Sequence, residues 1–473
     1  MASAVETMIR KTVGAGIHAL AQFNRKRLPK TDNPYLLGIH APMTEEKTIT
    51  DLPVTGIIPA ALDGRYLRIG PNPVAPDPAG YHWFTGDGMV HGIALKQGKA
   101  LWYRNRWIGS KRVSALLGRP PAPGPRHGSI DNVNTNVLGI AGRTFALVEA
   151  TSYPVELSHM LEEQTYNPFD NTLAGSFTAH PHRDPLTGEH HAIAYESTDQ
   201  NTIRHVVLSP DGKVVREQPI TVQHGPSIHD CAITARFVVI LDLPVTFSMK
   251  ALIGGHSFPY TWNPEHRARV GLLPRSGGND DMIWCDVEPA YVFHVANAYD
   301  TPDGTVVMDV IAYASMFADS LQGLDATGRF ERWTIDPNLR TVARRVIDAD
   351  TQEFPRPDER RFGQPYRYAY TMAVPLDDSI IADTRLYKHD LKACTRETHD
   401  FGPGRHPGEF VFVPASADAA EDEGWLIGFV IDLSNETTDL VILNADQFES
   451  APAASIRIPH RVPPGFHGNW VGN

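Results

Sequence analysis

The sequence predicts an all-β fold, built as one large catalytic domain over residues 34–473. Along this stretch, short runs of β-prone residues alternate with turns rich in Gly, Pro and Asp, and helical periodicity is scarce. The clearest runs are Arg143 to Ala150, Ala192 to Glu196, Phe237 to Leu243 and Val306 to Ala312. Many short strands without a linker favour a β-propeller or a large barrel over a string of domains.

Turn signals between these runs predict antiparallel neighbours. Each signal ends in a glycine, which tolerates the positive φ of a tight hairpin connection. The three clearest are Leu186 to Gly188, Pro210 to Gly212 and Pro302 to Gly304. No exact repeat is visible, so the sequence does not give a blade count by itself.

Residues 1–33 differ from the rest of the chain and predict an amphipathic, basic N-terminal arm. Apolar residues recur there at three- and four-residue steps, with basic residues around them. The apolar positions are Val5, Met8, Ile9, Val13, Ile17 and Leu20, and the basic ones are Arg10, Lys11, Arg25, Lys26 and Arg27. Two interpretations stay open: a helix docked on the protein's own body, or an arm that touches a membrane surface.

Composition excludes several classes of function. Acidic residues outnumber basic ones by 55 to 43, and a net charge of −12 opposes binding to nucleic acid. The three cysteines, Cys231, Cys285 and Cys394, are too few and too far apart for a disulfide framework or a thiolate metal site. No apolar stretch is long enough to span a membrane, and no signal peptide is recognisable, so we expect a cytoplasmic protein.

Four of the 21 histidines occur in motif-like settings. These are Thr178-Ala-His180-Pro, Ile228-His229-Asp-Cys, Val292-Phe-His294-Val and Gly465-Phe-His467-Gly. Separations of 49, 65 and 173 residues exclude a local metal loop and require ligands that converge from distant strands. A single histidine is more often an ordinary core or surface residue, and periodicity alone does not distinguish these four from His182, His190, His191, His205 and His224.

These settings, together with other segments in the same order, resemble the carotenoid cleavage oxygenase family. The supporting segments are Arg68 to Pro73, His82 to His91, Glu353 to Arg356, Gly408 to Pro414 and Glu421 to Gly424. The resemblance spans roughly Asn33 to Val471. It implies a seven-bladed β-propeller with Fe2+ on its axis, held by His180, His229, His294 and His467, under a dome of loops and helices that encloses an apolar tunnel.

The resemblance also implies roles for residues around the metal. Glu149, Glu353 and Glu409 match the family's carboxylates that accept the second ring N–H of a ligand, whereas His180 has no such glutamate. Thr135 matches a threonine whose methyl group restricts an open iron position. In the alternative interpretation, Thr135 is an ordinary strand residue. The implied reaction splits an alkene, at or near the centre of the polyene, into two carbonyl products with O2 and no organic reductant.

The substrate class is less determined by the sequence. Candidate tunnel residues are Phe84, Met89, Tyr103, Trp107, Val148 and Phe317. The stilbene-cleaving branch places a phenol-activating lysine where this chain has Val148, although Tyr103 could match that branch's tyrosine. We therefore expect a carotenoid or apocarotenoid rather than a lignostilbene or isoeugenol.

Two apolar segments in connecting regions, Val113 to Gly118 and Phe247 to Ile253, match tunnel-mouth patches of the family. They predict peripheral contact with the inner face of the membrane, and ordinary dome packing is the alternative. Two other functions stay open. A carotenoid-binding propeller without catalysis would have no reason to keep all four histidines and three glutamates. Isomerisation with ester cleavage would need a membrane-anchoring cysteine segment that the chain does not contain.

Overall fold

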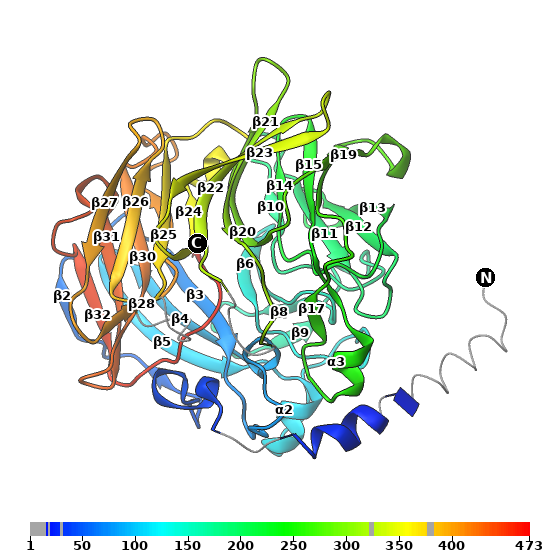
Figure 1. Cartoon of the computed structure of the whole chain (residues 1–473). Coiled ribbons are helices and arrows are strands. Elements are labelled where there is room, and N and C mark those ends of the chain that lie inside the picture. Colours follow the sequence, from blue (N-terminus) through cyan, green and yellow to red (C-terminus); the bar gives the residue numbers. More distant parts are fainter. Residues whose placement is uncertain (1–15, 18, 29–31, 321–325, 376–382) are drawn as a thin grey trace.

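The computed structural model describes residues 16–17, 19–28, 32–320, 326–375 and 383–473. Within these residues the fold is all-β and propeller-like, and six sheets of four to eight strands stand side by side around a common axis (Figure 1). The four β-prone runs are confirmed as strands: β7 (Arg143–Leu147), β11 (His190–Tyr195), β15 (Phe237–Asp242) and β21 (Val306–Tyr313).

The three predicted turns join antiparallel neighbours, and the glycine in each has the positive φ that its turn requires. Gly188 connects β10 (His182–Arg183) to β11, and Gly212 connects β12 (Thr202–Leu208) to β13 (Val214–Thr221). Gly304 connects β20 (Tyr291–Asp300) to β21. Strands β10 to β13 form one four-stranded sheet in sequence order.

Two other sheets are also four-stranded and run in sequence order from the axis outward. One contains β6 (Asn136–Ile140), β7, β8 (Val155–Leu157) and β9 (Gln164–Tyr166). The other contains β24 (Gln352–Pro357), β25 (Tyr368–Ala373), β26 (Arg385–Asp390) and β27 (Thr395–Asp400).

The largest sheet has eight strands, and both of its edge strands face the axis. Its order is β14-β15-β18-β19-β23-β22-β21-β20. Besides β15, β20 and β21, the sheet contains β14 (Cys231–Ile233), β18 (Arg269–Pro274), β19 (Ile283–Asp286), β22 (Arg329–Asp336) and β23 (Thr341–Asp348). One residue pair, Asp286 with Thr341, joins its two halves in parallel fashion, whereas the pairs within each half are antiparallel.

The last two of the six sheets each combine strands from both ends of the chain. One has the order β1-β5-β4-β3-β33, with β1 (Thr48–Ile49), β5 (Lys99–Trp107), β4 (Gly88–Lys96), β3 (Gly64–Pro71) and β33 (Gly468–Gly472). The other contains β2 (Val54–Gly56), β32 (Ala454–Ile458), β31 (Thr437–Asn444), β30 (Gly424–Asp432), β28 (Arg405–Pro407) and β29 (Val411–Pro414). These pairings close the ring, so neither sheet is complete until both ends of the chain have met.

The innermost strands lie next to one another around the axis, and Asn136 of β6 donates to the Ala179 carbonyl in the segment that precedes β10. Strand β33 contacts β6, β10 contacts β14, β14 contacts β20, β20 contacts β24, β24 contacts β29, and β29 returns to β33. Adjacent sheets pack face to face through buried side chains, and β3, β11, β15 and β21 are buried along their whole length. Strands buried on both faces tend to be apolar runs. The sequences of β15 and β21 are nearly continuous runs of this kind, whereas β3 contains two buried arginines and β11 begins with two buried histidines.

Few helices occur among the described residues. Apart from the N-terminal helical residues 19–25, they are α2 (Lys111–Leu116), α3 (Met249–Ile253) and the single turns η1 (Pro34–Leu36), η2 (Gly38–His40), η3 (Trp83–Thr85), η4 (Asn279–Asp281), η5 (Glu359–Arg361) and η6 (Ala445–Gln447). Serine caps begin both α-helices: Ser110 Oγ accepts from Val113 N, and Ser248 Oγ accepts from Ala251 N. A two-stranded sheet, β16 (Val245–Phe247) with β17 (Tyr260–Trp262), flanks α3.

Only part of the predicted N-terminal arm lies within the described residues. Residues 19–25 are helical there, and two side chains attach this helix to the segment that ends α3. Asn24 Nδ2 donates to the Ile253 carbonyl and Arg25 Nε donates to the Gly255 carbonyl, both at 2.8 Å. Residues 1–15, which carry most of the predicted apolar stripe, lie outside the described residues. In the described part of the chain no helix is long and apolar enough to cross a membrane.

Candidate metal centre

The four histidines of the predicted ligand set come together at the axis. His180 and His229 each lie two residues before an innermost strand, β10 and β14. His294 lies within β20, and His467 directly precedes β33. One ring nitrogen from each histidine lies within 4.8 Å of the other three. The ring of sheets thus brings together residues that are up to 287 positions apart.

Three of these imidazoles donate to a glutamate carboxylate, of which Glu353 and Glu409 are buried and Glu149 is partly exposed. His229 Nδ1 lies 2.5 Å from Glu149 Oε2, His294 Nδ1 lies 2.6 Å from Glu353 Oε2, and His467 Nδ1 lies 3.0 Å from Glu409 Oε1.

The fourth imidazole differs, because no carboxylate contacts the His180 ring among the described residues. The geometry therefore matches the expected pattern of three glutamates and four histidines.

The carboxylates decide where the ring protons lie. A carboxylate at Nδ1 holds the proton on that nitrogen, so Nε2 presents a lone pair. Neighbouring Nε2 atoms are 3.0 Å apart between His180 and His229, 3.3 Å between His229 and His294, and 3.1 Å between His294 and His467. Ligands at right angles around a metal–nitrogen bond of about 2.1 Å would be about 3 Å apart. The converging lone pairs need a cation, so the residues present fit a metal ion.

Burial keeps two of the ligand imidazoles neutral. Desolvation, together with the other histidines, lowers the pKa of His180 well below its usual value, and burial lowers the pKa of His467 to about 4. Burial also acts to lower the pKa of His294, but the Glu353 carboxylate outweighs it and the net shift is upward. A neutral imidazole is the form that binds a metal ion. In the metal-free protein, a proton therefore competes with the metal ion for the imidazole of His294.

The sequence did not predict the groups that hold the second oxygen of each glutamate. Tyr195 donates its hydroxyl to Glu149 Oε1, and Tyr313 donates to Glu353 Oε1 at 2.9 Å. The two tyrosines are 46 and 40 residues from their glutamates, and no local pattern connects them. Only alternation along strands β11 and β21 could have indicated that they point inward.

Glu409 is held differently, by a buried cation. Arg356 Nη1 donates to Glu409 Oε1 at 3.1 Å, and the backbone N–H of Gly468 donates to Oε2 at 2.8 Å. Burial acts to raise the pKa of Glu409, but Arg356 and His467 reverse this and lower it to about 2. Arg356 lies three residues after Glu353 in the same motif, and this position could have indicated that Arg356 belongs to the site.

Irregular backbone aims these side chains at the axis. The pairing of β20 with β21 is interrupted on both sides of Val295, next to His294, and the pairing of β24 with β25 shifts between Glu353 and Arg356. Bulges of this kind redirect side chains beside active sites. The residues that follow two of the glutamates, Ala150 and Phe354, have positive φ of 63° and 52°. Non-glycine residues rarely adopt this conformation, so local strain accompanies the site.

Thr135 lies beside the ligands. Its carbonyl accepts from the His467 N–H at 3.2 Å, and its Oγ1 donates to Asn134 Oδ1 at 2.9 Å. The backbone of Thr135 therefore helps to fix His467. The role of its methyl group at an open metal position stays a prediction.

Aromatic side chains adjoin the histidines, and two of the six predicted tunnel residues are among them. Phe84 and Phe317 contact each other and Phe293, with ring centroids 5.8 to 6.3 Å apart. Phe293 in turn meets the His229 ring edge-on at 5.4 Å. Phe84 also contacts Phe466, the residue before His467. A continuous apolar surface thus reaches the metal ligands.

The other predicted tunnel residues lie elsewhere. Met89 and Trp107 pack in a separate core cluster beside α2. Tyr103 is fully buried in β5, which β3 and β4 separate from β33 by about 14 Å at the usual strand spacing, and its hydroxyl contacts His91 Nδ1 at 2.9 Å. Val148 is half-buried and packs against the core between two sheets. Sequence position alone could not distinguish such core aromatics from residues near the ligands.

A cavity of about 640 Å³, with both polar and apolar residues in its walls, reaches His180, His294 and His467. Its walls follow the innermost strands away from the ligands, along β33 to Asn473 and along β6 to Gly142. None of the residues Phe84, Phe293 and Phe317 lines this cavity. The four histidines therefore have an approach along the axis with mixed polar and apolar walls, and a separate aromatic surface.

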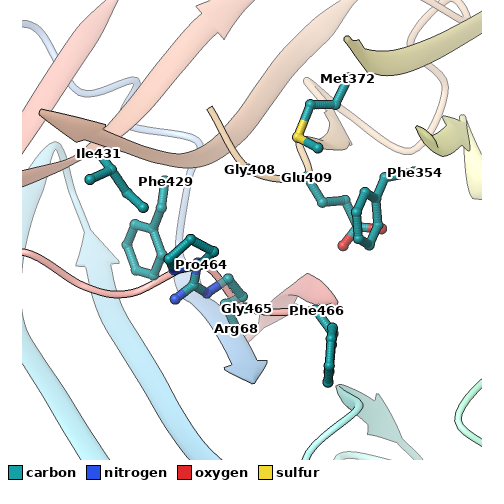
Figure 2. A pocket seen from close by; sticks show the side chains of 10 residues that line it. All are labelled: Arg68, Phe354, Met372, Gly408, Glu409, Phe429, Ile431, Pro464, Gly465 and Phe466. Carbon is teal, nitrogen blue, oxygen red and sulfur yellow. The ribbon is translucent and has the colours of Figure 1, made fainter. Parts of the chain in front are cut away.

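A second, much smaller pocket lies next to Glu409. Figure 2 shows it between Glu409 and Phe354 on one side and Arg68, Pro464 and Phe429 on the other. Its volume of about 10 Å³ has space for no more than a water molecule. This pocket cannot admit a substrate.

A ring of sheets with four histidines on its axis defines the class of site. Comparisons with known proteins then identify the family of the chain. The family model described as retinal pigment epithelial membrane protein matches residues 40–472. The chain is 42% identical to the carotenoid cleavage oxygenase of Mycobacterium tuberculosis, over 93% of this chain and 98% of that protein. It is 32% identical to carotenoid 9,10(9',10')-cleavage dioxygenase 1 of Arabidopsis thaliana, over 92% and 89% of the two chains.

Solved structures agree. The cobalt-substituted apocarotenoid oxygenase of Synechocystis is similar with a TM-score of 0.81 and 26% identity, over 91% of this chain and 97% of that one. The lignostilbene dioxygenase of Pseudomonas brassicacearum is similar with a TM-score of 0.84 and 26% identity, over 94% and 100%. The chain belongs to the carotenoid cleavage oxygenase family, and it is an enzyme of the dioxygenase class.

The Arg356–Glu409 pair generates a stability prediction for the metal-free protein. Glu409→Gln is expected to lower the free energy of unfolding at pH 7 by up to about 3 kcal/mol, because the folded-state pKa of about 2 lies below the ordinary value of 4.5. A lowered pKa stabilises the fold above about pH 4.5, and this contribution is lost as the pH falls toward 2. Urea unfolding at pH 7, 5 and 4 measures the difference from wild type, which should shrink at the lowest pH.

Glu359→Gln is the matched control, since Glu359 is the exposed partner of the same guanidinium. This variant should lose less than about 1 kcal/mol. Equal losses in the two variants, or a difference for Glu409→Gln that does not change with pH, would contradict the assignment.

Proposed function

We propose that the chain is an Fe2+-dependent dioxygenase that cleaves a C=C bond of a carotenoid or apocarotenoid to two carbonyl products. The observation that carries this proposal is the convergence of four imidazole Nε2 atoms, three of them oriented by glutamates. Fe2+ held there would supply open coordination positions for dioxygen chemistry. Both oxygen atoms enter the two carbonyl groups, so the electrons balance without an outside reductant.

The chain's own residues would bind, orient and exclude water. His180, His229, His294 and His467 would hold the metal. Glu149, Glu353 and Glu409 would keep each ring proton on Nδ1 and so fix the direction of each lone pair. Phe84, Phe293 and Phe317 would pack against the polyene beside His229 and keep water from the reacting bond. Thr135 would restrict access to an open position.

Several features support an apolar polyene over a phenolic stilbene. Fold similarity does not decide, because an apocarotenoid oxygenase and a lignostilbene dioxygenase both match at 26% identity. Two relatives with higher identity, at 42% and 32%, are named for carotenoid cleavage. Val148 replaces the lysine of the stilbene-cleaving pattern, and the Tyr103 hydroxyl contacts His91 in the core. Neither residue would stabilise a phenolate.

The cleaved bond is proposed to lie at or near the centre of the polyene. Product masses test this directly. Products of cleavage at the 9,10 position, which the name of the Arabidopsis relative specifies, would have different masses and would contradict a central cut.

We also propose that the ring has seven blades. The eight-stranded sheet would comprise two four-stranded blades, β14-β15-β18-β19 and β20-β21-β22-β23, which share one parallel residue pair at their outer strands. Both of its axis-facing edges, β14 and β20, contribute to the ligand set, as a blade's innermost strand should.

Peripheral membrane contact at the inner face of the membrane is a further part of the proposal. Large apolar side chains are exposed on both α-helices and on the described part of the arm: Leu20, Phe23, Leu116 and Met249. The N-terminal helix and α3 adjoin through Asn24 and Arg25. Figure 1 shows α2 and α3 toward the same end of the molecule. Sedimentation with anionic vesicles tests this contact, and no binding by the wild type would remove it.

Two rival functions make different predictions. A carotenoid-binding scaffold would contain no iron, whereas the proposed enzyme should contain it stoichiometrically. An isomerase with ester cleavage would give an isomerised alcohol rather than aldehydes. Metal analysis and product analysis of the purified protein distinguish all three.

Removing any one ligand should sharply reduce metal content and turnover. His180→Ala, His229→Ala, His294→Ala and His467→Ala each remove one of four protein ligands, and metal binding depends on all of them. Metal content by elemental analysis is the measurement. His224→Ala is the control, because His224 contacts His266 and lies outside the ligand set. Wild-type iron content in any of the four ligand variants would contradict that assignment.

The substrate prediction concerns Val148. Without the lysine that the stilbene-cleaving pattern has at this position, a buried phenol would lack a charge partner, at a cost of about 1–3 kcal/mol, or about 5- to 150-fold in binding. With Fe2+ and O2, an apocarotenal should therefore be cleaved faster than resveratrol or isoeugenol at equal concentration. Val148→Lys should slow the polyene reaction. The reverse order of rates would overturn the carotenoid assignment but leave the metal centre intact.

A further inference from the structure

Another buried carboxylate lies next to the ligands, and it is not one of the three glutamates that contact the ligand imidazoles. Asp230 directly follows His229 and is 4% exposed. Its Oδ1 accepts from His182 Nε2 and from the backbone N–H of the next residue, Cys231, both at 2.7 Å. Its Oδ2 accepts from the backbone N–H of Val295 at 2.8 Å. One side chain therefore contacts three separate strands.

Each of these contacts falls within two residues of a ligand. His182 is two residues after His180, Asp230 is one residue after His229, and Val295 is one residue after His294. Val295 lies where the pairing of β20 with β21 is interrupted, so the backbone around His294 depends on contacts outside its own ladder. Asp230 thus connects the segments of three ligands, including His180, whose ring no glutamate contacts among the described residues.

A structural metal site is the alternative for this cluster. His182, Asp230 and Cys231 are close enough together to hold an ion. However, both oxygens of Asp230 already accept hydrogen bonds, and His182 uses its Nε2 for one of them. The geometry is that of a satisfied hydrogen-bond network rather than of an open donor set.

We infer that Asp230 is a positioning residue that, through His182 and Val295, fixes the segments carrying His180, His229 and His294. This inference rests on the proposed function, because it requires those histidines to be metal ligands. It also gives His182 a role: although His182 is no ligand, its loss should loosen the metal centre.

The experiment compares Asp230→Asn with a matched pair elsewhere in the same sheet. Asp242 is equally buried, in β15, and accepts from His266 Nε2 at 2.8 Å and from Arg269 Nε at 2.7 Å. Asp242→Asn therefore disturbs a similar Asp–His pair that has no contact with a ligand segment's backbone. Asparagine has one acceptor oxygen, so in Asp230→Asn at least one of the three donors loses its partner.

Co2+ is the probe, and its affinity is measured by chelator competition alongside its visible absorption spectrum. Asp230→Asn is expected to weaken Co2+ binding roughly 10- to 100-fold and to shift the absorption bands, the range seen for outer partners of metal ligands. Asp242→Asn should keep wild-type affinity and spectrum even where thermal unfolding shows that it is destabilised. Absence of Co2+ binding by the wild type would instead count against the proposed function.

Two changes at His182 keep the inference testable if Asp230→Asn does not fold. His182→Phe removes the donor and should weaken Co2+ binding, whereas His182→Gln offers an N–H to Asp230 and should restore most of the affinity. Wild-type Co2+ affinity and spectrum in Asp230→Asn or in His182→Phe would overturn the inference. An equal loss of affinity in Asp242→Asn would do the same, because the effect would then follow from stability alone.

Discussion

The hydrogen bond from an imidazole Nδ1 to a glutamate carboxylate is the interaction on which the rest of the site depends. It occurs three times, at His229, His294 and His467. Each bond assigns the ring proton to the outer nitrogen and leaves the inner one as a lone pair. Lone pairs about 3 Å apart repel each other in the absence of a cation. The fold therefore has to hold the rings together against this repulsion, and this requirement explains why so much of the surrounding structure is hydrogen-bonded and buried.

The closed ring of sheets supplies that rigidity. Strand β33 positions His467 and pairs with β3, near the other end of the chain, while β2 completes the sheet that contains β29, next to Glu409. The two sheets that close the ring are thus also the two that adjoin the His467–Glu409 pair. Within the ring, interrupted pairings near His294 and Glu353 turn the side chains toward the axis. The same irregularity leaves backbone groups such as Val295 N–H to be satisfied from another strand, by Asp230.

The sequence predicted the fold class well because hairpin turns and alternating β-prone runs are local signals. Gly188, Gly212 and Gly304 indicated their turns without any knowledge of the ring. The histidines and glutamates were predicted through motifs in a fixed order, not through periodicity. Long-range partners were not predictable in this way: Tyr195 and Tyr313 are 46 and 40 residues from the glutamates that they contact. Asp230 stands next to His229, but its partners His182 and Val295 are 48 and 65 residues away, and a single sequence contains no pattern that links them. The prediction that Tyr103, Met89 and Trp107 line the tunnel was wrong for a similar reason, because they lie in core clusters. An aromatic or apolar residue in a strand gives no sign of which cavity it faces.

Charge balance explains why a divalent cation belongs in this centre. Glu149, Glu353 and Glu409 bring three carboxylates into the buried region, and Arg356 is the cation that contacts one of them. Asp230 is a fourth buried carboxylate beside the same histidines, so four negative charges lie close to one positive charge. Buried negative charge without a counter-ion is costly. Four neutral imidazoles add nothing to this balance, so a divalent cation among them would offset much of the remaining negative charge. The upward pKa shift of His294 has the same origin: without a metal, the Glu353 carboxylate favours a proton on its imidazole partner. A proton there offsets only one negative charge, whereas a divalent cation would offset two and satisfy all four lone pairs at once.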